Sequence, residues 1–124
     1  MKLVVFGLTV SSSWGNGHAT LWRGLARALG EAGVRFVFFE RDVPYYAQHR
    51  DPHDPRWGVL HLYAGFEEVR ALAERELADA DVAMVTSFCP DAVAAAELVA
   101  GSRVPRSVFY DLDTPVTMAK LDAG

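Results

Sequence analysis

The sequence predicts an α/β fold with a doubly wound, mostly parallel sheet of about five strands and helices on both faces. Short apolar runs alternate along the chain with segments of helical periodicity. These runs are apolar at nearly every position, which is typical of parallel strands that are covered on both faces. The first run leads directly into a glycine-rich segment and then a helical segment, which is the order of elements in a nucleotide-binding βα unit.

Five apolar runs are the expected strands, and they span residues 3–6, 34–39, 59–63, 82–86 and 108–110. Apolar residues recur at helical spacing in three segments, residues 21–29, 67–78 and 91–100. Gly33 is a natural stop for the first helix, and Pro90 and Asp91 are favoured in the first turn of the third. Right-handed crossovers leave few topologies for such a chain, so we expect one Rossmann-like domain over residues 1–124.

The composition is that of an ordinary globular protein, with 51% hydrophobic and 23% charged residues. A net charge of -4 without a basic run argues against nucleic acid as the main partner. The single cysteine, Cys89, excludes an intrachain disulfide and is compatible with a reducing compartment. Residues 1–13 have the outline of a signal peptide, but the valine-rich run and the loop and helix after it favour a buried strand. No run approaches the ~20 apolar residues of a membrane span, so we expect a cytoplasmic protein.

The glycine-rich segment between the first strand and the first helix is the strongest candidate site. Backbone N–H groups and the positive end of the helix converge there, which suits a phosphate, a carboxylate or a sugar hydroxyl. The helix dipole tends to keep the His18 ring neutral, so it can accept a proton from a hydroxyl or donate a hydrogen bond to a phosphate. The alternative is a histidine that only caps the loop. Candidate binding residues in this segment are Gly15, Asn16, Gly17 and Thr20.

Polar residues at the carboxyl ends of the other strands extend the candidate site, because ligands of doubly wound sheets bind beyond those ends. They are Asp42 after the second strand, Ser87 after the fourth, and Asp111 and Asp113 after the fifth. Ser87 is equally suited to capping the next helix, and Asp111 to accepting bonds from loop N–H groups.

Metal-binding patterns in the sequence are weak. The Asp111-Leu112-Asp113 segment resembles two D-x-D patterns, but the one found in phosphatases follows the first strand rather than the fifth. The histidines at positions 49, 53 and 61 show no ligand spacing with one another. We therefore expect no metal, and we expect Cys89 to be a small buried apolar residue.

The polar, proline-rich residues 41–57 predict a long loop, and such loops at strand ends are often lids or binding loops. Tyr45, Tyr46 and Trp57 offer flat faces to sugar rings, and Asp42 and His49 are available for sugar hydroxyls. The alternative is that these aromatic side chains pack onto the edge of the domain itself.

Two other functions remain open from the residues alone. Residues 15–20 lack the third glycine of a dinucleotide fingerprint and begin well past Gly7. Glu40 nevertheless ends the second strand, where a ribose-binding acid would lie, so a dinucleotide-binding oxidoreductase domain is one alternative. A small flavodoxin-like binding or receiver module, with Asp111 and Asp113 as its acidic cluster, is the other.

The last residues predict a longer protein. Thr114 suits a helix N-cap and Pro115 a first helical position, and the helix expected after them has barely begun at Gly124. We therefore expect the chain to be a fragment of a longer enzyme.

Residues 5–20, 38–46 and 109–115 resemble the amino-terminal half of CgeB-like, GT-B-fold glycosyltransferases of bacteria. The resemblance covers nearly the whole chain. In other enzymes of that fold, a similar G-x-G-H loop meets the acceptor and the donor diphosphate, and a histidine there can act as base, a role that falls on His18. The resemblance implies that residues 1–124 are the amino-terminal, acceptor-side half of a two-domain enzyme truncated after Gly124, and that this half is inactive alone. Its ligands would be a sugar acceptor and a nucleotide-sugar donor, the latter bound mainly by the missing carboxy-terminal domain, with no metal or other cofactor.

Overall fold

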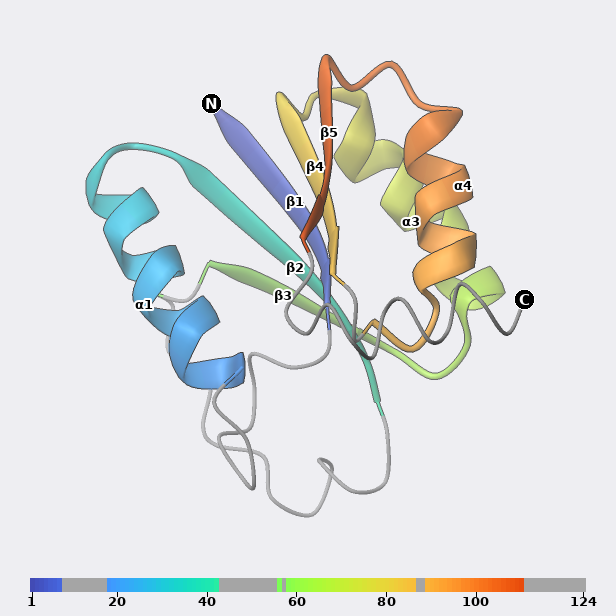
Figure 1. Cartoon of the computed structure of the whole chain (residues 1–124), viewed down its shortest axis with the longest axis horizontal. Helices are drawn as coiled ribbons and strands as arrows, with labels where there is room; N and C mark the ends of the chain where they lie inside the picture. Colours follow the sequence, from blue (N-terminus) through green and yellow to red (C-terminus); the bar gives the residue numbers. More distant parts are fainter. Residues whose placement is uncertain (8–17, 43–55, 57, 87–88, 111–124) are drawn as a thin grey trace.

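The computed structural model describes residues 1–7, 18–42, 56, 58–86 and 89–110, and these carry the sheet and its helices (Figure 1). The elements are β1 (Lys2–Gly7), α1 (His18–Glu31), β2 (Arg35–Arg41), β3 (Val59–Tyr63), α3 (Phe66–Ala78), β4 (Val82–Thr86), α4 (Ala92–Ala100) and β5 (Arg106–Tyr110). Every strand and helix predicted up to residue 110 is confirmed. The loop predicted from residue 41 was placed one residue too early, because Arg41 still pairs with Tyr63 in the sheet.

The five strands of the described part form one parallel sheet in the order β3-β2-β1-β4-β5, which confirms the predicted doubly wound α/β class. The chain adds β2 and β3 on one side of β1 and then crosses to the other side for β4 and β5. The direction of winding therefore reverses between β1 and β4. This is the strand order of dinucleotide-binding sheets and differs from the 2-1-3-4-5 order of flavodoxin-like domains.

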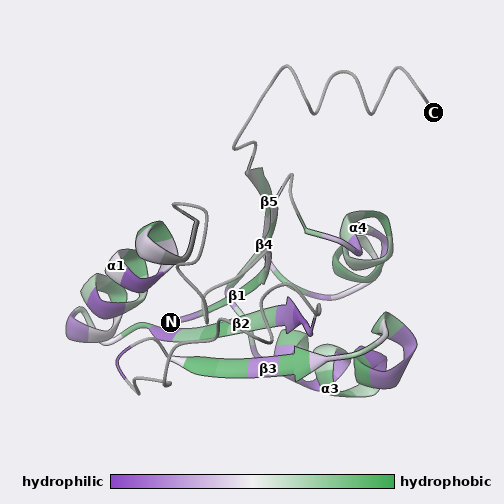
Figure 2. Ribbon diagram, turned by 90° about the horizontal axis from the view of Figure 1, so that it is seen from below, coloured by the Kyte–Doolittle hydropathy of each residue, from purple (hydrophilic) through white to green (hydrophobic). Residues whose placement is uncertain are grey.

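Alternate residues of β1 pack into two different hydrophobic clusters, since successive side chains of a strand point to opposite faces. Leu3 and Val5 join Trp22 of α1 in one cluster. Val4 and Phe6 lie in the other, to which α3 and α4 contribute Leu77 and Val99 among others. Burial on both faces explains why the central strands are apolar along most of their length (Figure 2).

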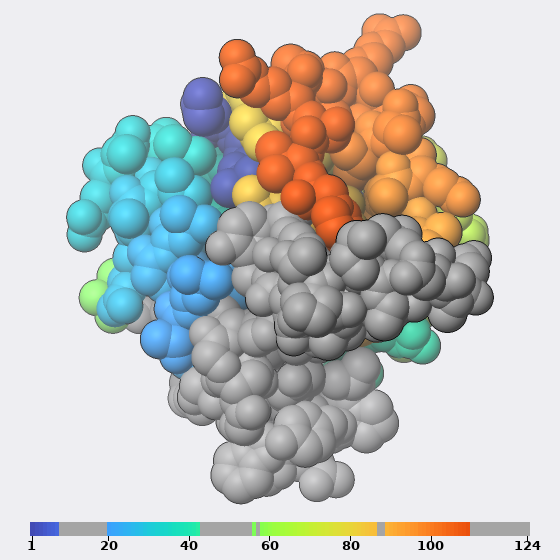
Figure 3. Space-filling view, viewed as in Figure 1, coloured from blue at the N-terminus to red at the C-terminus, as the bar shows by residue number. Residues whose placement is uncertain are grey.

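β5 is an edge strand and is less buried than the sequence predicts. Val108 is 40% exposed and Phe109 is 55% exposed, because fewer neighbouring side chains cover the faces of a sheet at its edge. Its side chains lie on the surface of the view in Figure 3. Of the helices described, none is both long and apolar enough to cross a membrane.

A buried lysine joins the amino end of β1 to the end of α3. The Lys2 side chain is almost fully buried, and its Nζ donates hydrogen bonds to Glu76 Oε1 at 3.0 Å and to Asp79. The backbone N–H of Lys2 donates to Asp81 Oδ2 at 2.7 Å, and His61 Nε2 lies 2.8 Å from Glu76 Oε2. This ionic network closes the amino edge of the sheet, away from the strand ends where the site was predicted.

Candidate functional site at the carboxyl edge of the sheet

On the side of the sheet where α1 packs, the last side-chain positions of β2, β1 and β4 lie in one row. We call this row the final rung, and it is made of Glu40, Gly7 and Thr86. Glu40 pairs directly with Gly7, and Thr86 follows Val85, the partner of Phe6. Paired residues of parallel strands share a face, so all three project toward the side on which α1 packs. The final rung crosses the point where the winding reverses, so it lies where doubly wound sheets bind ligands.

Gly7 is the middle of the final rung, and the ring of Phe38 fills the space where a side chain would project. A Cβ placed on Gly7 would lie 2.6 Å from Phe38 Cζ, which is closer than carbon atoms approach in proteins. Phe38 is itself fully buried and packs against Trp22 of α1 with ring centroids 5.7 Å apart. The end of β1 therefore keeps its backbone close to the neighbouring aromatic core, and glycine is required there.

The two outer members of the final rung are buried polar side chains, Glu40 and Thr86. Among the residues that the structure describes, Thr86 Oγ1 is buried without a hydrogen-bond partner. The sequence places Thr86 and Ser87 together at the end of this strand, and the predicted site residue was Ser87, one position later.

A second polar cluster lies on the other face of the same edge. Tyr63 Oη donates to Asp91 Oδ2 at 3.0 Å, and Arg41 Nη1 lies 3.5 Å from Asp91 Oδ1. Burial is the largest cause that raises the pKa of the Tyr63 phenol far above its usual range, and the negative charge of Asp91 adds to it. Burial also raises the pKa of the Cys89 thiol to about 11, so this thiol stays protonated and unreactive at neutral pH.

Asp91 has a different role from the one predicted for it. It is the N-cap residue of α4 rather than a member of the first turn, and within the described residues its side chain makes no capping bond. Its carboxylate instead contacts Tyr63 and Arg41. Sequence reasoning missed this cluster because positions 41, 63 and 91 come together only through the lateral order of the strands.

The structure describes three of the predicted site residues. His18 is the first residue of α1, and Thr20 is exposed in the first turn of that helix. Asp42 is exposed beyond β2, and its backbone N–H donates to the Tyr63 carbonyl at 2.7 Å. The start of α1 and the end of β2 are therefore both at the carboxyl edge, as predicted (Figure 1).

The other predicted site residues lie outside the described residues, as does the side chain of His18. They are Gly15, Asn16, Gly17, Ser87, Asp111 and Asp113, together with the aromatic residues Tyr45, Tyr46 and Trp57 and with His49 of the long predicted loop. In the part of the chain that is described, no group of three histidine, cysteine or acidic residues could hold a metal ion.

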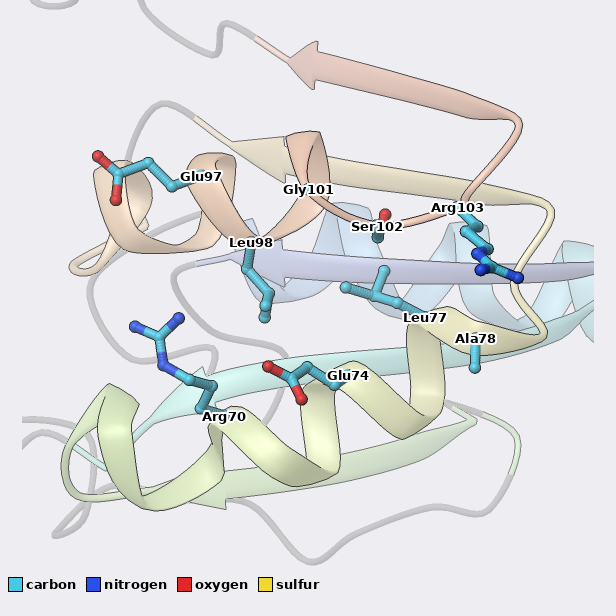
Figure 4. A pocket seen from close by; sticks show the side chains of 9 residues that line it. All are labelled: Arg70, Glu74, Leu77, Ala78, Glu97, Leu98, Gly101, Ser102 and Arg103. Carbon is cyan, nitrogen blue, oxygen red and sulfur yellow. The ribbon is translucent and has the colours of Figure 1, made fainter.

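A groove of about 640 Å³ lies elsewhere in the described part of the chain, between α3 and α4 (Figure 4). Arg70 and Glu74 reach into it from α3, and Glu97 lies across from them on α4. Arg70 is already paired with Glu67 at 2.6 Å. The groove carries mixed charges and no cluster of reactive groups, so it is a weaker candidate than the final rung.

Comparisons with protein-family models, with curated proteins and with solved structures found no match to this chain. The fold and the site define a Rossmann-like α/β domain.

Proposed function

We propose that the chain is the acceptor-side domain of a sugar-nucleotide-dependent glycosyltransferase, and that its ligands bind beyond the carboxyl ends of β1 and β4. The observation that carries the proposal is the reversal of winding between these two strands. Connections diverge at such a point and leave a crevice for a ligand. β1 leads from this point through the G-x-G-H segment into α1, and that segment carries the resemblance to GT-B enzymes.

The chemistry proposed for this edge is positioning, with His18 as the candidate base. The dipole of α1 contributes about 0.3–1 kcal/mol toward a bound diphosphate, which is too little to account for catalysis. In an attack on the donor sugar, the acceptor hydroxyl would form the new glycosidic bond and transfer its proton to the imidazole of His18, while the nucleotide leaves with the electrons of the broken bond. Retaining enzymes of the fold use the equivalent loop for positioning only.

The remaining parts of the proposal concern what lies outside these 124 residues. A carboxy-terminal domain would bind most of the nucleotide sugar, and the reaction would need no metal or other cofactor. The enzyme would work in the cytoplasm. The isolated chain is then expected to bind its ligands weakly and to be inactive.

Ligand titrations of the 124-residue chain test the proposal directly. Saturating ligand raises the melting temperature, and a concentration of about 100 times Kd adds roughly 2.7 kcal/mol to the free energy of unfolding. We expect small, saturable shifts with nucleotide sugars, none with NAD, and no sugar transfer or hydrolysis above blank. Robust turnover by the isolated chain would contradict its assignment as an inactive acceptor-side domain.

The role of His18 is tested in a protein that joins this chain to its carboxy-terminal domain. General-base catalysis contributes about 10²–10⁴ in rate, whereas one lost hydrogen bond to a charged group costs about 10- to 150-fold. A fall in kcat beyond about a thousandfold in His18→Ala would identify the base, and a loss of tens-fold a positioning residue. Wild-type activity in this variant would remove His18 from the site.

A dinucleotide-binding oxidoreductase domain is the second candidate, and one observation favours it. Glu40 ends β2 on the final rung of a sheet whose strand order is that of dinucleotide-binding domains. In those domains an acid at this position binds a ribose hydroxyl. A melting-temperature shift with NAD that disappears in Glu40→Gln, with no response to nucleotide sugars, would establish this alternative.

A further inference from the structure

We infer that the hydroxyl of Thr86 is a contact for the ligand of the carboxyl edge, and that it bonds to an oxygen of that ligand, either a sugar hydroxyl or a phosphate oxygen. The class of ligand rests on the proposed function. The assignment of Thr86 itself rests on the burial, bonding and position of this side chain.

The first observation is an unsatisfied hydroxyl. Thr86 is 0% exposed, and its Oγ1 has no hydrogen-bond partner among the described residues. Buried polar groups in folded proteins are nearly always hydrogen-bonded, because losing water without a replacement is costly. Valine would fill the same place in a strand with a similar shape and without this cost. Packing alone therefore does not explain the hydroxyl, and a partner from outside the chain does.

The second observation is the place of Thr86 in the sheet. It ends β4 beside the end of β1, at the reversal of winding. It lies on the α1 side, because Met84, two residues earlier on the same strand, packs against the cluster that contains Trp22.

The neighbouring position on the final rung is Gly7, which has no side chain, and the ring of Phe38 occupies the space where its Cβ would project. Glu40 and Thr86 lie on the strands to either side of it. Since Oγ1 is buried in the free chain, binding has to expose it before the hydrogen bond can form. The recovered hydrogen bond then favours the bound state.

Two substitutions separate a ligand contact from a structural hydroxyl. Thr86→Val removes the hydroxyl and keeps the branched shape, and Thr86→Ser keeps the hydroxyl. Ser107→Ala, on the exposed part of β5, is a matched control for loss of a hydroxyl outside the site. Each variant and the wild type are titrated with UDP-glucose, UDP, glucose and NAD, and their melting temperatures are measured without ligand.

We expect Thr86→Val to raise the melting temperature of the free chain by a few degrees, because an unsatisfied buried hydroxyl is removed. The same variant should bind whichever probe the wild type binds roughly 5- to 100-fold more weakly, because one hydrogen-bonding group of that ligand loses its partner. Thr86→Ser and Ser107→Ala should bind like the wild type. Weaker binding of UDP-glucose and glucose but not of UDP would identify a sugar hydroxyl, and weaker binding of UDP as well would identify a phosphate oxygen.

Two results overturn the inference. One is a lower melting temperature in Thr86→Val, which would mean that the hydroxyl stabilises the free chain. The other is unchanged affinity in that variant. Failure of the proposed function gives a different result. If the wild type responds to NAD alone, the glycosyltransferase proposal is contradicted. The inference about Thr86 then still requires that Thr86→Val bind NAD more weakly than the wild type. A wild type that binds none of the probes contradicts both proposals.

Discussion

The phenol oxygen of Tyr63 lies 3.0 Å from a carboxylate oxygen of Asp91, and this hydrogen bond joins the end of β3 to the start of α4. The two residues are 28 positions apart in the chain. Arg41, paired with Tyr63 in the sheet, holds the other oxygen of the same carboxylate. The contact spans the sheet from β3 to the β4 side and fixes the entry to α4 on the face opposite to the final rung.

Tyr63→Phe tests the strength of this contact. The ring and its packing stay in place while the phenol hydroxyl is lost, so we expect the free energy of unfolding to fall by about 1–2 kcal/mol, measured by urea denaturation. The substitution is repeated in an Asp91→Ala background as the control. If the hydrogen bond is the cause, Tyr63→Phe costs much less there; an equal cost in both backgrounds would mean that Tyr63 stabilises the fold only by packing.

Gly58 and Gly33 form a matched pair for testing a close backbone approach. Both have positive φ angles, 83° and 82°, which L-residues rarely adopt. A Cβ on Gly58 would lie 2.3 Å from the Phe36 carbonyl oxygen, whereas one on Gly33 would meet open space. We expect Gly33→Ala to cost about 1 kcal/mol and Gly58→Ala about 2–4 kcal/mol. Equal losses in chemical denaturation would show that the backbone near Gly58 relaxes without strain.

Gly7→Ala should destabilise the final rung by overpacking. The added methyl group meets the ring of Phe38, which is held in place by Trp22, and such insertions cost about 1–3 kcal/mol. Phe38→Leu opens space at that point, so the double variant should recover part of what Gly7→Ala loses. A double variant whose loss equals the sum of the two single losses would contradict a direct contact between the two positions.

The Lys2 network should make stability depend on pH below neutrality. Burial opposes ionisation of Glu76, but hydrogen bonds from His61 and Lys2 outweigh it and hold the pKa of Glu76 below its usual value. Lys2 and Arg35 likewise lower the pKa of Asp79. Carboxyl groups whose pKa falls on folding stabilise the protein above their unfolded pKa, about 4, and lose this contribution as the pH falls through the folded pKa.

The expected result is a melting temperature that falls steeply below about pH 4 in the wild type and less steeply in Lys2→Met. Lys2→Met should also melt at a lower temperature than the wild type at pH 7, where both carboxylates are charged. Arg75→Met removes a positive charge from the exposed side of α3 and is the control. The same pH profile in Lys2→Met and in the wild type would show that the buried lysine does not hold these carboxylates in their charged form.

The sheet was predictable because burial on both faces is visible in the sequence as apolar runs such as residues 82–86. The exposure of Phe109 was not, since an edge strand has the same local pattern as a central one. The sequence could also predict that the candidate site lies beyond the carboxyl ends of the strands. The bond between Tyr63 and Asp91 depends on which strands are neighbours, and the burial of Lys2 depends on acidic residues at the end of α3, so neither has a local signal.

The central position of β1 has a consequence for how the chain is made. β1 is synthesised before β4, yet its start is anchored to a residue 79 positions later, where Lys2 meets Asp81. A ribosome adds about 5–20 residues per second, so β1 waits several seconds for its second neighbour while both of its apolar faces are still incompletely covered. Among the described strands, β1 therefore waits longest for a neighbour that follows it in the chain, and its apolar side chains are open to contacts with other nascent chains during that time.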